Sequence, residues 1–339
     1  MKKTNQRVRI AVDAMGGDYA PSEIVGGAVL AAEKEDVELI LAGSSDILAT
    51  ELAKYSSSRL PIHCVHASEF IREDEPLTLT ARRRANTSIA VATKVVKVGE
   101  AEAVVSAGPT GALVASAVQH LGMIEGIDRP VIGGALATFA PNTVLIDCGG
   151  NVDCKPHHLV TFAVVGTIYA KKLLKIENPT VGLLNIGTEI GKGNDLTQQS
   201  YSLLERSGLN FIGNVEGNAI LTGQVNVIVC DGFVGNVLFK FCEGGFDVID
   251  GWLRRKIRSF PLAGLLKNLS NDLKSLTSMP ESVGSGLIWG VNGVALKMHG
   301  ASGAREVAEK ITQAKLIVDM DVIDSLKSEL AAIKRKLNF

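Results

Sequence analysis

The chain has 339 residues, of which 46% are hydrophobic, and its formal net charge at pH 7 is −1. A chain of this size can bury a large core, and a charge this close to zero gives no global field that would attract nucleic acid or an acidic membrane. The five cysteines form no CxxC pair, and no apolar stretch follows the basic start, so we expect a cytoplasmic protein with reduced cysteines and no signal peptide.

Short β-rich runs alternate with longer helical patterns along the chain. Several of the runs are unbroken apolar stretches, which is typical of strands buried on both faces of a parallel sheet. We expect strands at Arg9–Met15, Val37–Ala42, Pro61–His66, Ala103–Ala107, Thr143–Cys148, Thr180–Ile186, Asn210–Val215, Val225–Cys230 and Val291–Met298. We expect helices at Pro21–Glu35, Asp46–Ser56, Thr110–Leu121 and Asp195–Ser207, and one or two over Ala304–Leu337.

This alternation predicts an α/β fold with a doubly wound, mostly parallel sheet flanked by helices. We expect one catalytic domain over residues 1–339. The longest nearly apolar run, Leu159–Ala170, is shorter than the roughly 20 residues that span a bilayer.

Six expected strands end in a glycine turn that carries small polar residues. In such sheets ligands bind at the carboxyl ends of the strands, and glycine lets backbone N–H groups approach an anion. The alternative is that these glycines only form the turns. The set favours a cleft suited to phosphate, with candidate ligands at Asp13, Gly16, Gly17, Thr110, Gly111, Gly187, Thr188 and His299.

Two basic positions could hold an anion. Lys192 stands between an expected strand and helix, and Arg84 ends an arginine triplet; both could equally be solvated. The segment from Gly187 to Lys192 is too short for a P-loop and no GxGxxG follows a strand, so we expect no nucleotide cofactor.

Acidic, histidine and cysteine side chains also stand near strand ends. Asp147, Asp153 and Asp231 show no spacing of a known metal site, so we expect no metal. His157 and His158 follow Pro156 and are typical of a helix start. The cysteines at strand ends lack a basic partner in sequence, so we do not expect them to act as nucleophiles.

Several motifs together resemble one family, the bacterial phosphate acyltransferases of the PlsX family. They run in order from about residue 8 to about residue 320. The matching segments are Ile10–Asp18, Ser106–Leu113, Gly126–Pro130, Asn151–Pro156, Val181–Glu189, Lys192–Asn194, Phe211–Glu216 and Asp231–Val237. The chain departs from the family pattern at Pro109, where asparagine is usual, at Gly149–Asn151, and at Ser282–Gly290 near Trp289.

The resemblance implies a fold like that of isocitrate and isopropylmalate dehydrogenases, and a homodimer. It also implies the transfer of a long-chain fatty acyl group from acyl carrier protein to inorganic phosphate. A membrane acyltransferase then uses the acyl phosphate on glycerol 3-phosphate for phospholipid synthesis. The alternatives are a phosphotransacetylase acting on coenzyme A esters, a metal- and NAD-dependent dehydrogenase, and a non-catalytic scaffold that binds acyl carrier protein.

In the hypothetical mechanism, phosphate is held by Lys192 and by the amides at Gly187–Thr188 and Thr110–Gly111. Asn151, Asn236 or backbone amides near Gly232 would stabilise the tetrahedral oxyanion by donating hydrogen bonds to it. Asp231 and Asp147 would orient those groups or relay a proton.

A basic, amphiphilic segment indicates a helical hairpin over residues 246–280. The hairpin could lie on the anionic inner face of the cell membrane or grip acidic acyl carrier protein; the alternative is a dimer or core contact. The residues expected to make the contact are Trp252, Arg254, Arg255, Arg258, Leu265 and Leu269.

Overall fold

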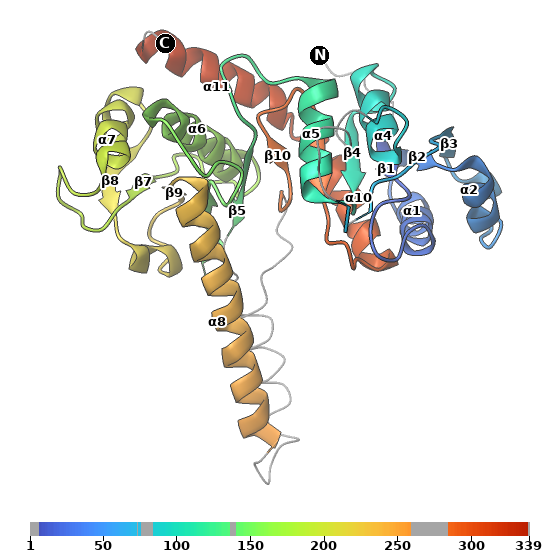
Figure 1. Cartoon of the computed structure of the whole chain (residues 1–339). Coiled ribbons are helices and arrows are strands. Elements are labelled where there is room, and N and C mark those ends of the chain that lie inside the picture. Colours follow the sequence, from blue (N-terminus) through green and yellow to red (C-terminus); the bar gives the residue numbers. More distant parts are fainter. Residues whose placement is uncertain (1–6, 73, 76–83, 136–139, 259–283, 338–339) are drawn as a thin grey trace. The chain divides into compact units, whose positions relative to one another are not determined.

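The computed structural model describes residues 7–72, 74–75, 84–135, 140–258 and 284–337 (Figure 1). Contacts divide the chain into two compact units, each built around one sheet. The first unit comprises Met1–Glu125 and Gly286–Asp324, and the second comprises Gly126–Ser285 and Ser325–Phe339. The single domain expected over residues 1–339 stays a prediction, and each unit is described by itself.

The first unit holds a five-stranded parallel sheet. Its strand order is β11 (Val294–Lys297), β4 (Ala103–Ser106), β1 (Val8–Asp13), β2 (Val37–Gly43) and β3 (Ile62–His66). Strand β4 is buried throughout, and the last four residues of β1 are buried as well, whereas Arg9 interrupts the apolar run at the start of β1. All five strands run in one direction, so their carboxyl ends meet at one edge of the sheet.

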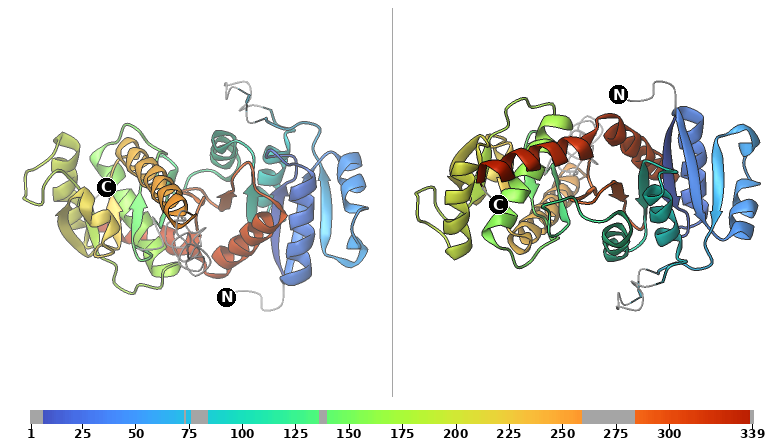
Figure 2. Two further views of the ribbon diagram at one scale, coloured as in Figure 1. Left: turned by 90° about the horizontal axis from the view of Figure 1, so that it is seen from below. Right: turned by 90° about the horizontal axis from the view of Figure 1, so that it is seen from above.

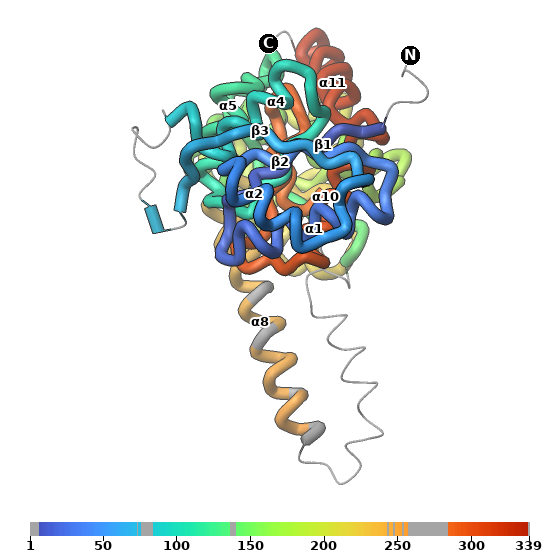
Figure 3. Tube along the Cα trace, turned by 90° about the vertical axis from the view of Figure 1, so that its right-hand side faces the viewer, coloured from blue at the N-terminus to red at the C-terminus, as the bar shows by residue number. Residues whose placement is uncertain are grey.

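Helices pack on this sheet in two pairs. One pair is α1 (Ser22–Lys34) with α10 (Ala304–Asp319), which lie side by side in both views of Figure 2, and the other is α4 (Ser88–Lys97) with α5 (Thr110–Leu121). Gly27 allows the first pair to approach, because a Cβ there would lie 2.5 Å from the Val307 Cβ. The remaining elements are α2 (Ser45–Leu52), the short helix η1 (Ser57–Arg59) and β10 (Ile288–Trp289). Figure 3 shows α2 beside β2 and β3.

The second unit holds a mixed sheet with the order β5 (Val131–Ala135), β6 (Val144–Ile146), β9 (Val227–Val229), β7 (Val181–Leu184) and β8 (Phe211–Val215). Only the first pair, β5 with β6, is antiparallel in this set. The helices are α6 (Pro156–Lys172), α7 (Asp195–Ser207), α8 (Gly232–Arg258) and most of α11 (Val322–Leu337), with the short helix η2 (Gly217–Leu221). Most of α6 is buried, and Gly166 lets it pack on Val227.

The expected α/β fold, with mostly parallel strands flanked by helices, is confirmed. All nine expected strands are present and the C-terminal segment forms two helices, whereas β5 and β10 were not predicted. The first arm of the expected hairpin is α8, and residues 259–283, with Leu265 and Leu269, lie outside the described residues. In the part of the chain that the structure describes, every helix is too short or too polar to cross a bilayer.

Candidate functional site

Polar residues gather at the carboxyl edge of the second unit's sheet. Because β6, β9 and β7 are parallel neighbours, the residues that follow them emerge at the same edge. Asp147 follows β6, Asp231 follows β9 closely, and Asn185 follows β7. This is the position at which open α/β sheets bind ligands, and it agrees with the sequence prediction.

Asp147 is a fully buried carboxylate at the start of the loop that follows β6. It accepts hydrogen bonds from the Ile132 N–H (3.2 Å), the Gly150 N–H (3.0 Å) and Asn151 Nδ2 (2.7 Å). Burial raises the pKa of Asp147, and these hydrogen bonds act in the opposite direction. The contacts show an acid that organises a loop; its part in proton relay stays a prediction.

Asn151 is also buried, and its amide group is already engaged. Nδ2 donates to the Pro130 carbonyl (2.9 Å) and to Asp147, while the Asn151 carbonyl accepts from the Gly232 N–H (2.7 Å). An amide carries two N–H donors, so neither is left for an oxyanion in this arrangement. The contacts therefore support a positioning role, and the oxyanion role expected for Asn151 stays a prediction.

Asp231 immediately precedes helix α8 and caps its start. Its Oδ1 accepts from the Val234 N–H (2.9 Å), which satisfies one of the free amides of the first turn. Gly235, one turn into the helix, is required because a Cβ there would overlap the Asp147 carbonyl oxygen. The start of α8 is thereby held against the Asp147 loop.

Near the start of α8, the Asn236 side chain and two backbone N–H groups have no hydrogen-bond partner among the described residues. Asn236 is exposed, and its side chain lies beside Gly149, where a Cβ would be 3.1 Å from Asn236 Nδ2. Gly149 has φ +123°, a conformation that favours glycine. The N–H groups of Gly149 and Phe233 find no acceptor among the described residues. These groups can donate to a developing negative charge.

Lys192 lies in the exposed connection between β7 and α7. Among the described residues no carboxylate lies within ion-pair distance of its ammonium group. Asn194 caps α7 by accepting from the Thr197 N–H (3.0 Å). The N–H groups of Gly187 and Thr188 also find no acceptor in the described chain. The loop thus presents an ammonium group and free amides, and the role of these groups in binding phosphate stays a prediction.

The first unit has its own polar edge, centred on Asp13. This buried carboxylate accepts from Ser106 Oγ (2.6 Å), which in turn accepts from the Gly108 N–H (3.0 Å). Burial raises the pKa of Asp13, and the hydroxyl groups of Ser106 and Ser88 oppose that shift. Gly16 fits only as glycine, because a Cβ would lie 2.7 Å from the Gly108 nitrogen. Asp13 therefore joins the ends of β1 and β4.

The remaining candidates of this edge lie on neighbouring loops. Gly17 has φ +106° and lies against Ala107, and His299 is exposed after β11. Thr110 and Gly111 are the first residues of α5, whose cap residue, Pro109, provides no side-chain hydrogen bond. The phosphate-binding roles of these residues stay predictions.

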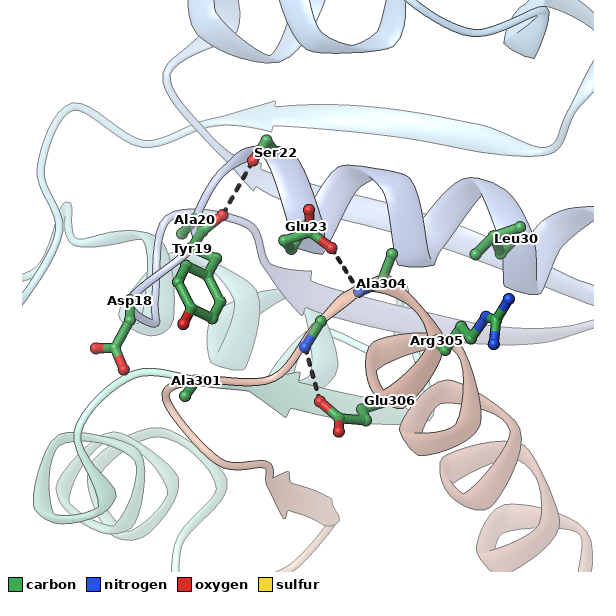
Figure 4. Close-up of a pocket in the computed structure, with 11 residues that line it drawn as sticks. Asp18, Tyr19, Ala20, Ser22, Glu23, Leu30, Ala301, Ala304, Arg305 and Glu306 are labelled. Carbon is green, nitrogen blue, oxygen red and sulfur yellow. Dashed lines mark hydrogen bonds between the residues drawn. The ribbon is translucent and has the colours of Figure 1, made fainter.

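The N-terminus of α10 differs from the expectation of an open anion site. It borders a cavity of about 960 Å³, in which the chain's own carboxylates take the first amides (Figure 4). Glu23 Oε2 accepts from the Ala304 N–H (2.8 Å), and Glu306 Oε2 accepts from the Gly303 N–H (2.7 Å). Two negative charges already occupy these donors, so the loop before α10 does not offer them to phosphate.

Arg84 also has anionic partners within the chain. Its guanidinium lies 3.6 Å from Glu69 Oε2 and contacts the Glu75 carboxylate. Two carboxylates offset its charge, which weakens attraction to a further anion. Its expected role in binding phosphate stays a prediction.

A side-chain cluster that sequence reasoning missed joins Asp128 to the start of α6. Asp128 Oδ2 lies 3.1 Å from His157 Nε2 and 3.7 Å from His158 Nε2. A metal ion could use such a set, but His158 Nδ1 accepts from the Lys155 N–H (3.1 Å). Neutral His158 therefore carries its proton on Nε2, on the side of Asp128, so neither of its ring nitrogens is available as a metal ligand in this arrangement.

The cysteines at strand ends are poor nucleophiles in this environment. Burial raises the pKa of Cys148 and of Cys230 well above the ordinary thiol value. A thiol that stays protonated at neutral pH cannot attack a thioester efficiently. This agrees with the expectation from the sequence that neither cysteine acts as a nucleophile.

Helix α8 carries apolar side chains on two faces. Leu238, Phe239 and Cys242 lie on the side that packs with Phe246 against the core of the second unit. Other large apolar residues of the helix are exposed, namely Phe233, Val234, Val237, Phe241, Val248, Ile249 and Trp252. The exposed set recurs at helical spacing, so it forms an apolar stripe.

Basic residues follow this stripe near the end of α8. Arg254 pairs with Asp250 at 2.6 Å, Arg255 is exposed, and Arg258 is the last residue of the helix. An apolar stripe next to exposed cations is typical of helices that lie on an anionic surface. Contact of this region with lipid or carrier protein stays a prediction.

One family model and several known proteins are similar to this chain over most of its length. The model of the family described as "Fatty acid synthesis protein" matches residues 8–325. The chain is 43% identical over 329 residues to "Phosphate acyltransferase" of Thermoanaerobacterium thermosaccharolyticum, covering 96% of this chain and 98% of that protein. It is 45% identical over 324 residues to "Phosphate acyltransferase" of Moorella thermoacetica, covering 94% and 95%.

Among solved structures, the fold is similar to that of a phosphotransacetylase from Streptococcus pyogenes. The TM-score is 0.64 at 17% sequence identity, and the match covers 92% of this chain and 94% of that chain. At this identity the likeness supports the α/β fold and carries no information on substrate.

Proposed function

Because this chain belongs to the fatty acid synthesis protein family of phosphate acyltransferases, we propose that it transfers a long-chain fatty acyl group from acyl carrier protein to inorganic phosphate. The observation that carries the proposal is the identity of 43% and 45% to phosphate acyltransferases over nearly the whole chain. The acyl phosphate would then serve a membrane acyltransferase that acts on glycerol 3-phosphate in phospholipid synthesis.

The chemical step needs positioning more than covalent help from the protein. A phosphate oxygen attacks the thioester carbonyl, forms the new C–O bond, and shifts the carbonyl electron pair onto oxygen. Collapse of this tetrahedral oxyanion breaks the C–S bond, and the departing thiolate takes up the proton that hydrogen phosphate carried. Because a thiol has a pKa of about 8.5, its thiolate is a tolerable leaving group near neutral pH. No cofactor is required for these steps.

Phosphate binding falls to the loop between β7 and α7 in this proposal. The Lys192 ammonium supplies a positive charge, and the N–H groups of Gly187 and Thr188 supply neutral donors. Holding the nucleophile beside the thioester removes most of the entropic cost of a bimolecular reaction. The same role stays proposed for Thr110 and Gly111 in the first unit.

The oxyanion is assigned to the free donors near the start of α8. Asn236 Nδ2 and the N–H groups of Gly149 and Phe233 are available, whereas the Asn151 amide is engaged. Fixed donors aimed at the developing charge stabilise the transition state. Asp231 and Asp147 support these donors by holding α8 and the Gly149 loop in place.

Helix α8 is the proposed contact surface for anionic lipid or acyl carrier protein. Its apolar stripe and the exposed Arg255 fit a peripheral contact with anionic lipid, where the acyl phosphate would be consumed. The acidic acyl carrier protein is the alternative occupant of this surface. A homodimer is part of the same proposal and follows from the family resemblance.

The decisive test measures the products directly. Purified protein is incubated with long-chain acyl carrier protein, with and without inorganic phosphate, and free thiol and acyl phosphate are assayed. We expect thiol release that depends on phosphate, with acyl phosphate formed in equal amount. If the protein binds acyl carrier protein but releases no thiol, the result would favour a non-catalytic scaffold. If the protein prefers short acyl-coenzyme A, the result would identify coenzyme A esters as the acyl donor.

The role of Lys192 is tested in the same assay. Loss of a charge-assisted contact is worth about 1.5–3 kcal/mol, so Lys192→Ala should raise KM for phosphate roughly 10- to 100-fold. Lys97→Ala, which removes another exposed lysine, is the matched control. A Lys192→Ala enzyme with the wild-type KM for phosphate would contradict the assignment.

A further inference from the structure

The loop that carries Lys192 is tied down by side-chain amides from separate elements. Asn185, just after β7, donates from Nδ2 to the Lys192 carbonyl oxygen at 3.0 Å. Asn214, on β8, donates from Nδ2 to the Glu189 carbonyl oxygen at 2.9 Å. The two amides thus hold the loop from its sheet side, on both sides of its central turn.

A third amide holds the loop from the helix side. Gln198, in the first turns of α7, donates from Nε2 to the Gly191 carbonyl oxygen at 2.7 Å and to the Gly193 carbonyl oxygen at 3.1 Å. Both glycines have positive φ, +92° and +91°, and they flank Lys192. Three side chains therefore bind four carbonyl groups within residues 189–193.

We propose that Asn185, Asn214 and Gln198 are positioning residues for phosphate, an inference that rests on the proposed function of this loop. A carbonyl oxygen that points at a bound phosphate repels it, whereas one that accepts an amide hydrogen bond is held away. With the carbonyl groups fixed, the Lys192 ammonium and the free N–H groups of the loop keep a constant arrangement. Preorganisation of this kind lowers the cost of binding.

The chemistry of the three side chains fits this role. An amide donates without adding charge, so it leaves the field of Lys192 intact. Both polar atoms of the Asn185 side chain make hydrogen bonds, since Oδ1 also accepts from the Ile186 N–H at 2.8 Å. Its orientation is thereby fixed, and an aspartate in the same place would lose the bond to the Lys192 carbonyl.

Asn214 provides a second, independent indication. It is 6% exposed, and its Oδ1 has no hydrogen-bond partner among the described residues. A buried strand position normally takes an apolar residue, and an unpaired polar atom there is costly. The donation from Nδ2 to the Glu189 carbonyl accounts for an asparagine at this position, because it anchors the start of the loop.

Gln198 offers the sharpest test because it is exposed, so its replacement leaves the core intact. Gln198→Met keeps the size and helix propensity of the side chain and removes both donors. Gln199→Met is the matched control, since Gln199 is also exposed and makes no hydrogen bond to the loop. The wild-type and both variants are titrated with inorganic phosphate at saturating acyl carrier protein.

We expect Gln198→Met to raise KM for phosphate about 5- to 30-fold, the effect of losing two neutral hydrogen bonds, with kcat and KM for the acyl donor unchanged. Gln199→Met should match the wild-type. Calorimetric titration with inorganic phosphate alone should show the same loss of affinity, and Asn185→Asp should show it too.

The outcomes separate this inference from the proposed function. If the wild-type turns over with phosphate but Gln198→Met and Gln199→Met share one KM for phosphate, the positioning role is wrong and the function stands. If the wild-type shows no phosphate-dependent turnover, the proposed function itself fails. A rise in KM for the acyl donor alone would also overturn the positioning role.

Discussion

Replacing Asp231 distinguishes a carboxylate that caps a helix from one that transfers a proton. Its Oδ1 accepts from the Val234 N–H at 2.9 Å, at the start of a helix of 27 residues. Loss of an N-cap costs about 0.5–2 kcal/mol, and loss of a negative charge near the helix start adds about 0.3–1 kcal/mol. We therefore expect Asp231→Ala to lower the free energy of unfolding by roughly 1–3 kcal/mol.

Asp231→Asn keeps the capping oxygen and removes only the charge. Asparagine caps helices about as well as aspartate, so the loss of stability should stay below about 1 kcal/mol. Because the observed contact is a cap, we expect the turnover of Asp231→Asn to stay within about threefold of the wild-type, an activation difference below about 0.7 kcal/mol. Asp231→Ala should slow turnover more, since Asn236 one turn later loses its support.

The assay pairs urea unfolding with initial rates at saturating acyl donor and phosphate. Asp153→Ala is the control, since Asp153 is an exposed acid that makes no hydrogen bond among the described residues. General acid–base catalysis by one side chain is worth about 10²- to 10⁴-fold. An Asp231→Asn variant that is stable but slower by about 100-fold or more would refute the capping explanation and assign proton transfer to Asp231.

Two further predictions concern Asp13 and helix α8. Ser106→Ala removes a hydrogen bond to the Asp13 carboxylate, which should cost about 1.5–3 kcal/mol of stability where that carboxylate is ionised. Since burial raises the folded-state pKa of Asp13, its contribution to stability is fully present below the unfolded pKa and is lost as pH rises through the folded pKa. Urea unfolding should therefore show a larger loss for Ser106→Ala at about pH 8 than at about pH 4, and an equal loss at both would contradict the reasoning. For α8, replacing both Phe241 and Trp252 by glutamate should weaken co-sedimentation with anionic vesicles at least about tenfold, because burying each side chain is worth about 1.5–3 kcal/mol. Phe70→Glu, at another exposed aromatic residue, should have no effect, and unchanged vesicle binding in the double variant would assign the stripe to a protein partner.

The sequence was most informative where local signals coincide. Helices α5 and α7 have the predicted bounds because Pro109 and Asn194 mark their starts, and glycines with positive φ follow their ends. Strand β5 was missed for a physical reason. Gly133 lies on it because a Cβ there would come within 2.7 Å of the Leu145 carbonyl oxygen, and glycine removes the apolar pattern by which a strand is recognised.

The site was predictable in its location but not in its internal contacts. Parallel strands place their carboxyl ends at one edge, so the glycine-rich segments after them were expected to gather there. The pairing of Glu23 with the Ala304 N–H joins residues 281 apart, and no local pattern encodes it. The same holds for the Pro130 carbonyl, which accepts from the Asn151 amide across 21 residues of sequence. Contacts between residues that are distant in sequence determine which polar groups remain free. Such contacts cannot be inferred from a single sequence.

This distinction divides the polar residues at the strand ends into two physical classes. Asp13, Asp147 and Asn151 are buried and their polar groups are largely engaged, so replacing them should act first on stability. Lys192 and Asn236 are exposed and make no hydrogen bond through their side chains among the described residues, so replacing them should act on turnover with little change in unfolding. A site for a transient anion needs both classes, because free donors hold a fixed direction only when engaged neighbours support them.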